Sequence, residues 1–426
     1  MGRGWTRDTP ALTLALLAAI STCGFIDRIL MNVLAQPIKL EFGLSDTQVA
    51  LVAGLAFAAL NAGLGIFVAR VAERRHRLSL IAIGTVLWSV ATAACGFATS
   101  FASLLLARIG VGVGEAVGLP AASSVVSDCY PREKRATAMS VMLLAPPIGA
   151  FLGSAAGGLI AHHWGWRHAF WIAAVPGACF ALLLILLVAE PMRGRFDDLG
   201  SETDRVPPLR AVLARIWGRH SLRHLLIGTT IASAVGFGLN AFMAAWLTRR
   251  FGFDFAQAGV AAGLLTSVPA ITGVWGVGWL ADRLGRTDAR WYALLPGLTL
   301  LAAAPLYVLA MTRETPAAAI AALTAAALVQ YCYLGPAAGV FQNMMHPRMR
   351  ASSTAITNLV YSLVGGGLGP VLVGALSDRL APEATPTGSA MGLGWAMALT
   401  ACGYAWGGIH LLWAARRIRE ELILPA

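Results

Sequence analysis

The stretch Gly278-Trp279-Leu280-Ala281-Asp282-Arg283 ends one of the long apolar segments of this chain. Similar stretches end three other segments: Gly65-Ile-Phe-Val-Ala69-Arg70, Gly158-Leu-Ile-Ala-His162-His163 and Gly374-Ala-Leu-Ser-Asp378-Arg379. Gly65 and Gly278 are 213 residues apart, which is half of the 426 residues, and Gly158 and Gly374 are 216 apart. This spacing predicts two similar halves, each made of two smaller repeats.

The composition points to a membrane protein. Apolar residues make up 57% of the chain and charged residues 12%, whereas a soluble domain is typically about 25% charged. An ordinary water-soluble fold could not bury so much apolar surface, which argues against soluble enzymes and disordered scaffolds. The net charge of +11 does not indicate nucleic-acid binding, because the basic residues lie between apolar runs rather than on one soluble face.

Twelve segments are long enough to cross a bilayer as helices, which takes about 20 mostly apolar residues. They cover residues 11–36, 45–71, 78–98, 101–129, 132–161, 167–189, 222–248, 255–281, 288–312, 316–345, 350–377 and 388–415. We therefore expect an all-α membrane protein with an N-terminal six-helix bundle (1–190), a cytoplasmic linker (191–221) and a C-terminal six-helix bundle (222–426). Each half contains two three-span units, and an odd number of spans inverts neighbouring units, as in alternating-access transporters.

The loops that hold most Lys and Arg predict the orientation. With the N-terminus inside, 24 of the 32 basic residues lie inside and two lie within spans. Six lie outside: Lys39, Arg167, Arg249, Arg250, Arg313 and Arg379. Because positive loops stay cytoplasmic, both termini are expected in the cytoplasm and the chain in the inner membrane. Within the linker, residues 209–220 could form a basic amphipathic helix on the inner leaflet; the alternative is a solvated linker.

Four charged residues lie deep within predicted spans: Asp27 and Arg28 in the first, Arg108 and Glu115 in the fourth. A charge at the centre of a span costs about 2.5–3.5 kcal/mol on insertion scales, so such residues persist when they pair or face water. Arg108 and Glu115 share one helix face, about 10 Å apart along the axis. We expect Asp27 to face Arg108, with Arg28 pointing elsewhere. All four are proton-coupling candidates; the alternative is a permanent ion-pair lock.

The second half has no buried charge pair, which suggests a division between a charged coupling half and an amphipathic half that fits the substrate. Its candidate substrate-binding residues are Phe237, Asn240, Met243, Trp246, Gln330, Tyr331, Tyr333, Asn358 and Tyr361. A headgroup could bind near Arg28 or Arg108. For each residue the alternative role is core packing.

The loop from Gly278 to Arg286 resembles the signature loop of the major facilitator superfamily, and Gly165-Trp166-Arg167 resembles that superfamily's loop between spans 5 and 6. The resemblance implies a twelve-helix major facilitator fold with a cytoplasmic gate. The gate residues it implies are Arg70, Asp282, Arg283 and Arg286. The first half departs from the pattern, because Ala69 occupies the usual acidic position.

Two further stretches, Phe25-Ile-Asp27-Arg28 and Arg108-Ile-Gly-Val-Gly112-Val-Gly114-Glu115, resemble the Spinster branch of this superfamily. That resemblance implies transport of lysolipids or sphingosine-1-phosphate-like lipids with proton coupling. The alternative is a proton-coupled carrier or exporter of a small organic anion, sugar acid or drug. No zincin, nucleophile-elbow or phosphate-loop motif occurs, so we expect no enzyme activity. We also expect a monomer with no cofactor and no metal, whose partners are the substrate, protons and membrane lipids.

Overall fold

The structure, a computed structural model, describes residues 9–55, 58, 64, 76–130, 138–139, 141–142, 144–192, 208–345, 349–381 and 385–421. Every regular element in these residues is a helix. Within this described part of the chain, eight helices are long and apolar enough, by length and composition, to cross a membrane. Helical segments lie at each of the twelve predicted spans, the second of which is described continuously only as far as Leu55. The all-α fold predicted from the sequence is confirmed.

The chain divides into two compact units. Unit 1 comprises Met1–Leu44, Ala56–Glu202 and Asp254–Gly263, and unit 2 comprises Ser45–Leu55, Thr203–Phe253 and Leu264–Ala426. The units follow the two halves of the sequence, except that one short segment of each half belongs with the opposite unit.

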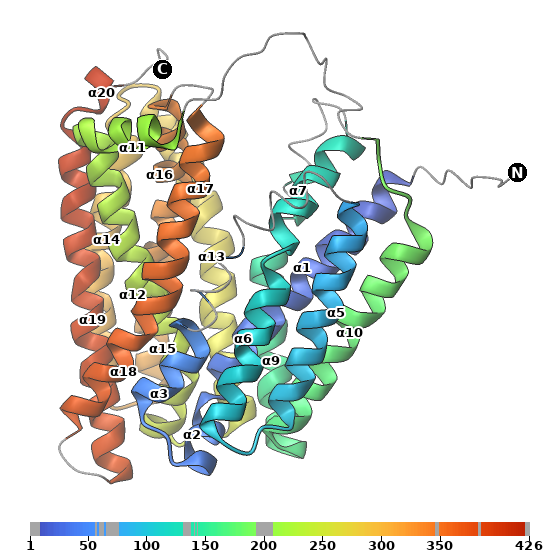
Figure 1. Ribbon diagram of the computed structural model, residues 1–426. Helices are drawn as coiled ribbons and strands as arrows, with labels where there is room; N and C mark the ends of the chain where they lie inside the picture. Colours follow the sequence, from blue (N-terminus) through green and yellow to red (C-terminus); the bar gives the residue numbers. More distant parts are fainter. Residues whose placement is uncertain are drawn as a thin grey trace, which may run out of the picture. The chain divides into compact units, whose positions relative to one another are not determined.

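The helices of unit 1 carry the four buried charges. Its described helices are α1 (Pro10–Val33), α2 (Ala35–Phe42), α5 (Arg77–Gly96), α6 (Phe101–Glu115), α7 (Gly118–Cys129), α9 (Ala145–Trp164) and α10 (Trp166–Leu187). α13 (Phe255–Gly285) begins in unit 1 and continues in unit 2. Figure 1 shows α1, α5, α6 and α10 running side by side along the unit.

Unit 2 is built around the long helices α12 (His220–Phe251), α14 (Trp291–Met311) and α19 (Pro386–Ala415). Its other elements are α3 (Asp46–Ala50), η1 (Leu51–Leu55), α11 (Leu209–Gly218), α15 (Pro316–Gln330), η2 (Tyr331–Tyr333), α16 (Leu334–Asn343), α17 (Arg350–Val360), η4 (Tyr361–Leu368), α18 (Gly369–Leu380) and α20 (Ile418–Glu421). α11 lies across the end of α12 (Figure 1) and buries Val212 and Ile216. The helix considered for residues 209–220 is therefore present.

The same local turn precedes Ser45–Leu55 and Asp254–Gly263, the two segments that belong with the opposite unit. Gly43 and Gly252 end helices with φ of 64° and 70°, a left-handed conformation that glycine adopts without strain. Two residues later Ser45 and Asp254 cap the next helix. The Gln48 amide N–H donates to Ser45 Oγ at 3.1 Å and the Gln257 amide N–H donates to Asp254 Oδ1 at 2.8 Å. Each glutamine side chain in turn accepts from the amide N–H of its capping residue. This turn is a second internal repeat of the sequence.

Among the described residues, three of the predicted spans are interrupted beside candidate site residues. The fourth breaks at Ala116 and Val117, directly after Glu115. The tenth changes to a 3₁₀ turn at Tyr331, and the eleventh contains a π-helical segment that begins at Tyr361. Such irregular turns are frequent at functional sites. Each break in these helices thus adjoins a residue that the sequence singled out.

Gly43→Ala tests the left-handed turn. No described atom lies within 4 Å of an added Cβ, so the cost is conformational and we expect a loss of about 1 kcal/mol of unfolding free energy. The matched control is Gly118→Ala, in open space at the start of α7, which should be neutral or stabilising by up to about 1 kcal/mol. Equilibrium unfolding of the purified variants measures both, and equal losses would contradict the assignment.

Candidate functional site

The four buried charges of unit 1 form two ion pairs. Arg108 Nη1 lies 3.5 Å from Asp27 Oδ2, and both Nε and Nη2 of Arg28 lie 2.6 Å from Glu115 Oε2. The predicted contact between Asp27 and Arg108 is confirmed. Arg28 points away from that pair, as expected, and its partner Glu115 is a contact that sequence reasoning did not predict.

The two pairs differ in tightness and in exposure. The Asp27–Arg108 distance of 3.5 Å exceeds the 2.7–2.9 Å typical of charge-assisted hydrogen bonds, so this pair is held mainly by Coulomb attraction. Asp27 is 2% exposed and Arg108 is fully buried, whereas 38% of the Arg28 side chain is exposed. Unit 1 therefore holds one loose, buried pair and one tight pair whose cation a ligand could reach.

Small residues bring α6 close to α5 and so position Arg108 and Glu115. A Cβ on Gly114 would lie 2.6 Å from the Trp88 amide nitrogen and 2.7 Å from the Gly84 carbonyl oxygen. Gly84 faces Gly114 in the same way. Such small-residue contacts let membrane helices approach closely. Only glycine fits at this crossing.

A second charged cluster ties together the ends of three helices of unit 1. Arg77, 2% exposed at the start of α5, donates from Nε to Glu190 Oε1 at 2.7 Å and from Nη1 to Asp128. Glu190 also accepts from the Leu78 amide N–H at 2.9 Å. Burial works to raise the pKa of the Glu190 carboxyl, but the Leu78 N–H and the Arg77 guanidinium outweigh it and lower this pKa. Sequence reasoning missed the cluster.

In unit 2, Asp46 at the start of α3 is the centre of another network. Its carboxylate accepts from Arg249 Nη2 and Nη1 at 2.7 and 2.8 Å and from Ser377 Oγ at 2.6 Å. The Asp378 carboxylate accepts from the Asp46 and Thr47 amide N–H groups, both at 2.9 Å. This network joins α3 to α12 and α18. Sequence reasoning missed it, although an arginine on the side with few positive charges is a signal for a carboxylate partner.

Several of the substrate-binding candidates meet in the interior of unit 2. Asn240 Nδ2 donates to the Tyr331 hydroxyl at 3.2 Å, and the Tyr361 hydroxyl donates to Thr229 Oγ1 at 2.6 Å. The remaining candidates are placed as follows: Phe237 and Asn358 are exposed, Met243, Trp246 and Tyr333 are buried, and Gln330 is buried and accepts from the Tyr404 hydroxyl.

Two tyrosines that sequence reasoning did not select complete this group. The Tyr307 and Tyr404 rings stack with centroids 5.7 Å apart, and the Tyr404 hydroxyl donates to Gln330 Oε1. Of the seven tyrosines of the chain, Tyr307, Tyr333 and Tyr404 are buried and Tyr331 and Tyr361 half-buried within unit 2. These tyrosines thus bring hydroxyl groups into the interior of unit 2, whereas its buried ion pair of Asp46 and Arg249 lies at the end of α12.

The gate candidates remain predictions. Arg70 lies outside the described residues. Asp282, Arg283 and Arg286 are exposed around the end of α13. Asp282 Oδ1 accepts from the Tyr292 hydroxyl at 3.1 Å, and the Arg283 guanidinium lies 5.6 Å from the centroid of the Trp279 ring.

Glu190→Gln tests the cluster around Arg77 through its pH dependence. Because the folded-state pKa of Glu190 is lowered, its stabilising effect is present above the ordinary pKa of about 4.3 and disappears as the pH falls through the folded-state value. We expect a loss of about 2 kcal/mol near pH 7. The gap from wild type should narrow as the pH falls below about 4.3.

Thermal unfolding from pH 7 to pH 3.5 measures this difference. The control is Glu420→Gln, an exposed carboxyl on α20, which should follow the wild-type curve throughout. A Glu190→Gln deficit that stayed constant over the whole range would show that the carboxylate charge is not what stabilises the cluster.

Comparison with known proteins identifies the family. The model of the Major Facilitator Superfamily matches residues 16–370. An MFS-type efflux pump of Mycolicibacterium smegmatis is 32% identical over 412 residues, covering 96% of this chain and 94% of the relative. A probable sphingolipid transporter, spinster homolog 1 of Arabidopsis thaliana, is 25% identical over 364 residues, covering 80% of this chain and 74% of the relative.

A solved structure matches the chain from end to end. The crystal structure of a bacterial homolog of the human lysosomal transporter Spinster, inward-facing and unoccupied, is 28% identical with a TM-score of 0.91, covering 99% of this chain and 100% of that one. The resemblances predicted from the sequence are confirmed, and the protein is a transporter rather than an enzyme. It belongs to the major facilitator superfamily, as a secondary transporter similar to the Spinster branch.

Proposed function

We propose that this protein moves an amphipathic lipid, such as a lysophospholipid or a sphingosine-1-phosphate-like molecule, by proton-coupled alternating access. The observation that carries the proposal is the pair of unequal ion pairs in unit 1. Buried ionisable residues in membrane spans commonly mark proton relays and substrate paths. Two relatives support the lipid class by name, the plant sphingolipid transporter and a mouse sphingosine-1-phosphate transporter that is 23% identical.

Charge balance explains how a proton and a substrate would be coupled. Asp27, Arg28, Arg108 and Glu115 sum to zero net charge. Protonation of Asp27 leaves Arg108 buried without its counter-charge, which is costly in a low-dielectric interior. An anionic headgroup that approaches the cluster restores neutrality. Proton uptake at Asp27 and binding of an anion therefore favour each other.

The exposed part of Arg28 is the contact point we assign to the headgroup. Its guanidinium keeps its bond to Glu115 while 38% of the side chain is exposed, so a phosphate can bind without first breaking an ion pair. Arg108, fully buried beside Asp27, stays the coupling residue. Phe237, Asn240, Tyr331, Asn358 and Tyr361 stay the substrate-binding candidates of unit 2, with apolar surface and hydroxyl or amide groups of the kind that an amphiphile requires.

Gates at opposite ends complete the proposed cycle. We assign the end of unit 2 that carries α11 and α20 to the cytoplasm, because exposed arginines gather there, as the positive-inside rule requires. Asp282, Arg283 and Arg286 belong to the gate at that end. The network of Asp46 and Arg249 lies at the other end of α12 and forms the latch that opens when substrate faces outward.

The second candidate function is export of a small organic anion or drug. The relative in M. smegmatis, 32% identical over 96% of this chain, is described as an efflux pump. The proton chemistry of unit 1 serves either cargo equally well. The identity of the ligand that binds near Arg28 separates the two.

Asp27→Asn tests proton coupling. Reconstituted wild-type protein should show lysolipid flux that changes across pH 5.5–8, and the variant should lose that pH dependence because the amide cannot titrate. The control Asp254→Asn removes a carboxylate but retains the helix cap, since Asn caps as well as Asp. It should keep the wild-type pH profile. A pH profile unchanged by Asp27→Asn would exclude Asp27 from coupling.

Arg28→Ala tests the headgroup contact. Thermal unfolding of purified protein should shift upward with lysophospholipid or sphingosine-1-phosphate, and the variant should lose at least tenfold in apparent affinity, as expected for a lost charge-assisted contact of about 1.4 kcal/mol or more. The control Arg313→Ala removes an exposed arginine after α14 and should bind as wild type does. Stabilisation only by small water-soluble anions would favour the export function instead.

A further inference from the structure

One face of α19 is a continuous apolar stripe. Residues at spacings of three, four or seven are between 39% and 59% exposed, namely Met391, Trp395, Leu399, Trp406, Ile409 and Trp413. In a membrane transporter a face of this kind contacts lipid chains, and tryptophans mark the region near the headgroups. The stripe ends at Arg416 and Arg417, both exposed. The apolar stripe could therefore contact the acyl chains of a phospholipid while Arg416 and Arg417 lie at the level of its headgroup.

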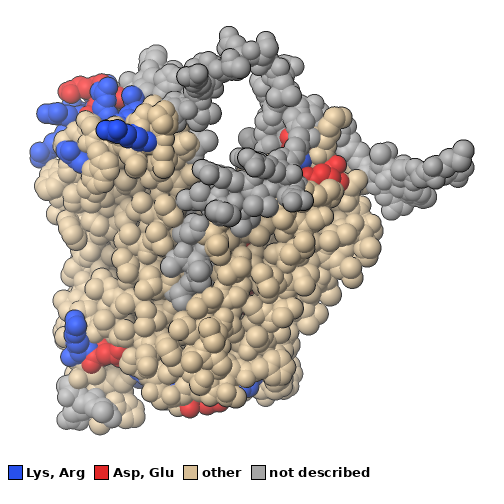
Figure 2. Space-filling view, viewed as in Figure 1, with Lys and Arg blue, Asp and Glu red and all other residues tan. Residues whose placement is uncertain are grey.

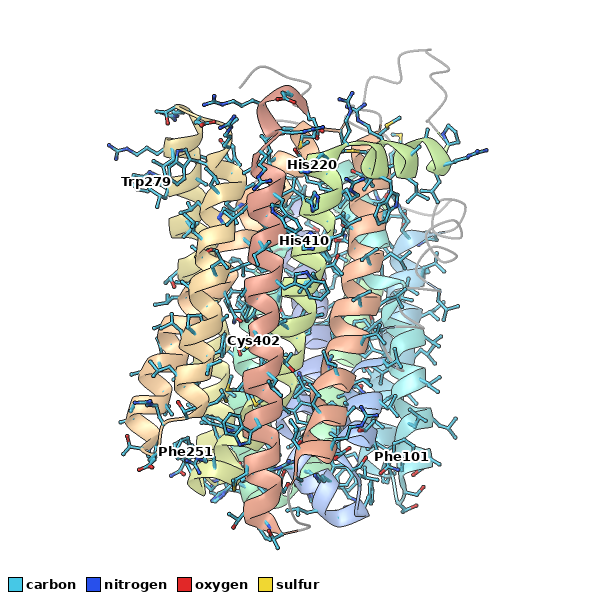
Figure 3. The ribbon with its side chains drawn as sticks, turned by 90° about the vertical axis from the view of Figure 1, so that its left-hand side faces the viewer. Phe101, His220, Phe251, Trp279, Cys402 and His410 are labelled. Atoms are coloured by element: carbon cyan, nitrogen blue, oxygen red, sulfur yellow. The ribbon has the colours of Figure 1, made fainter. Side chains whose placement is uncertain are left out.

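Histidines lie beside the charged end of the stripe. Nδ1 of His224 on α12 and Nδ1 of His410 on α19 are 2.8 Å apart, and the Trp413 ring contacts both histidine rings with centroids 5.4 and 5.2 Å away. The His220 ring lies 4.5 Å from that of His224. Figure 3 shows His220 at the end of the bundle and His410 deeper, on the same side of unit 2. Polar rings thus descend from the end of α12 along the upper part of the stripe.

The positive charges at this place exceed the negative ones. Burial and the nearby charges of Arg417, Arg223 and Arg416 lower the pKa of His220. The nearby Glu421 carboxylate is engaged by the amide N–H groups of His220 and Ser221, at 3.0 and 2.9 Å. Within the described part of the chain neither Arg416 nor Arg417 has a carboxylate partner. Figure 2 shows Lys and Arg gathered at this end of unit 2.

We propose that this place, the α12–α19 surface formed by His220, Arg223, His224, Trp413, Arg416 and Arg417, binds the phosphate headgroup of an anionic membrane phospholipid. The acyl chains lie along the stripe of α19. Guanidinium groups match phosphate oxygens with paired hydrogen bonds, and basic surfaces of this kind between spans bind anionic headgroups. A free phosphate would use the arginines but not the stripe. The lipid is a resident of this surface and not the transported cargo.

Native mass spectrometry of purified, delipidated protein tests the proposal with phosphatidylglycerol and phosphatidylcholine as probes. Wild type should retain phosphatidylglycerol in preference to phosphatidylcholine. Arg416→Gln combined with Arg417→Gln should weaken phosphatidylglycerol binding at least tenfold, because each arginine near an anionic headgroup contributes about fivefold. The matched control, Arg250→Gln combined with Arg313→Gln, removes two exposed arginines from the other end of unit 2 and should bind as wild type does.

Three outcomes would overturn the proposal. If the Arg416 and Arg417 double variant retained as much phosphatidylglycerol as wild type, these arginines would not form a lipid site. If both double variants lost phosphatidylglycerol equally, the lipid would be attracted by the overall charge only. Displacement of the lipid by inorganic phosphate alone would show an ion site without a lipid. Thermal unfolding of each variant checks that it is folded. Since the readout is retention of a diacyl lipid and not flux, failure of the transport proposal leaves this result unaffected.

Discussion

A charge inside a membrane protein requires a counter-charge, and in unit 1 the pair of Asp27 and Arg108 meets that requirement. Arg108 is fully buried and Asp27 nearly so, hence removing either partner would take from the other its opposite charge in the interior of the unit. The pair constrains the helices around it. α1 must present Asp27 to α6, and α6 must approach α5 closely, which only the facing glycines Gly84 and Gly114 permit.

The same requirement accounts for arginines on the side with few positive charges. Arg167 lies 2.7 Å from Glu41, whose pKa the Arg167 contact lowers, and Arg249 lies 2.7 Å from Asp46. An ion pair with a carboxylate therefore explains why each of these arginines lies on this side, which the positive-inside rule alone does not explain. The arginines near α11 and α20 are mostly exposed instead. The paired arginines hold helices together, whereas the exposed arginines are those that the positive-inside rule counts.

The sequence predicted those contacts that follow from helical spacing and from the depth of a residue within its span. Asp27 and Arg108 could be paired because both lie at similar depth in their spans. The network of Asp46 could not be found that way, since its partners Arg249 and Asp378 are 203 and 332 residues away, and no periodicity relates them. Likewise, hydropathy marks the tenth span but does not show that its helix changes to a 3₁₀ turn at Tyr331.

Both ion pairs of unit 1 join the same two helices. Asp27 and Arg28 are neighbours in α1, whereas Arg108 and Glu115 lie about two turns apart on α6, so the two pairs contact α6 at different depths. The four charges sum to zero, so the two pairs together leave no net charge in the interior. In the transport proposal, a proton on Asp27 or an anion at Arg28 changes this balance, and a ligand shifts a conformational equilibrium only by its differential affinity for the two states. Two pairs that differ in exposure thus give the proton and the anion separate places to act.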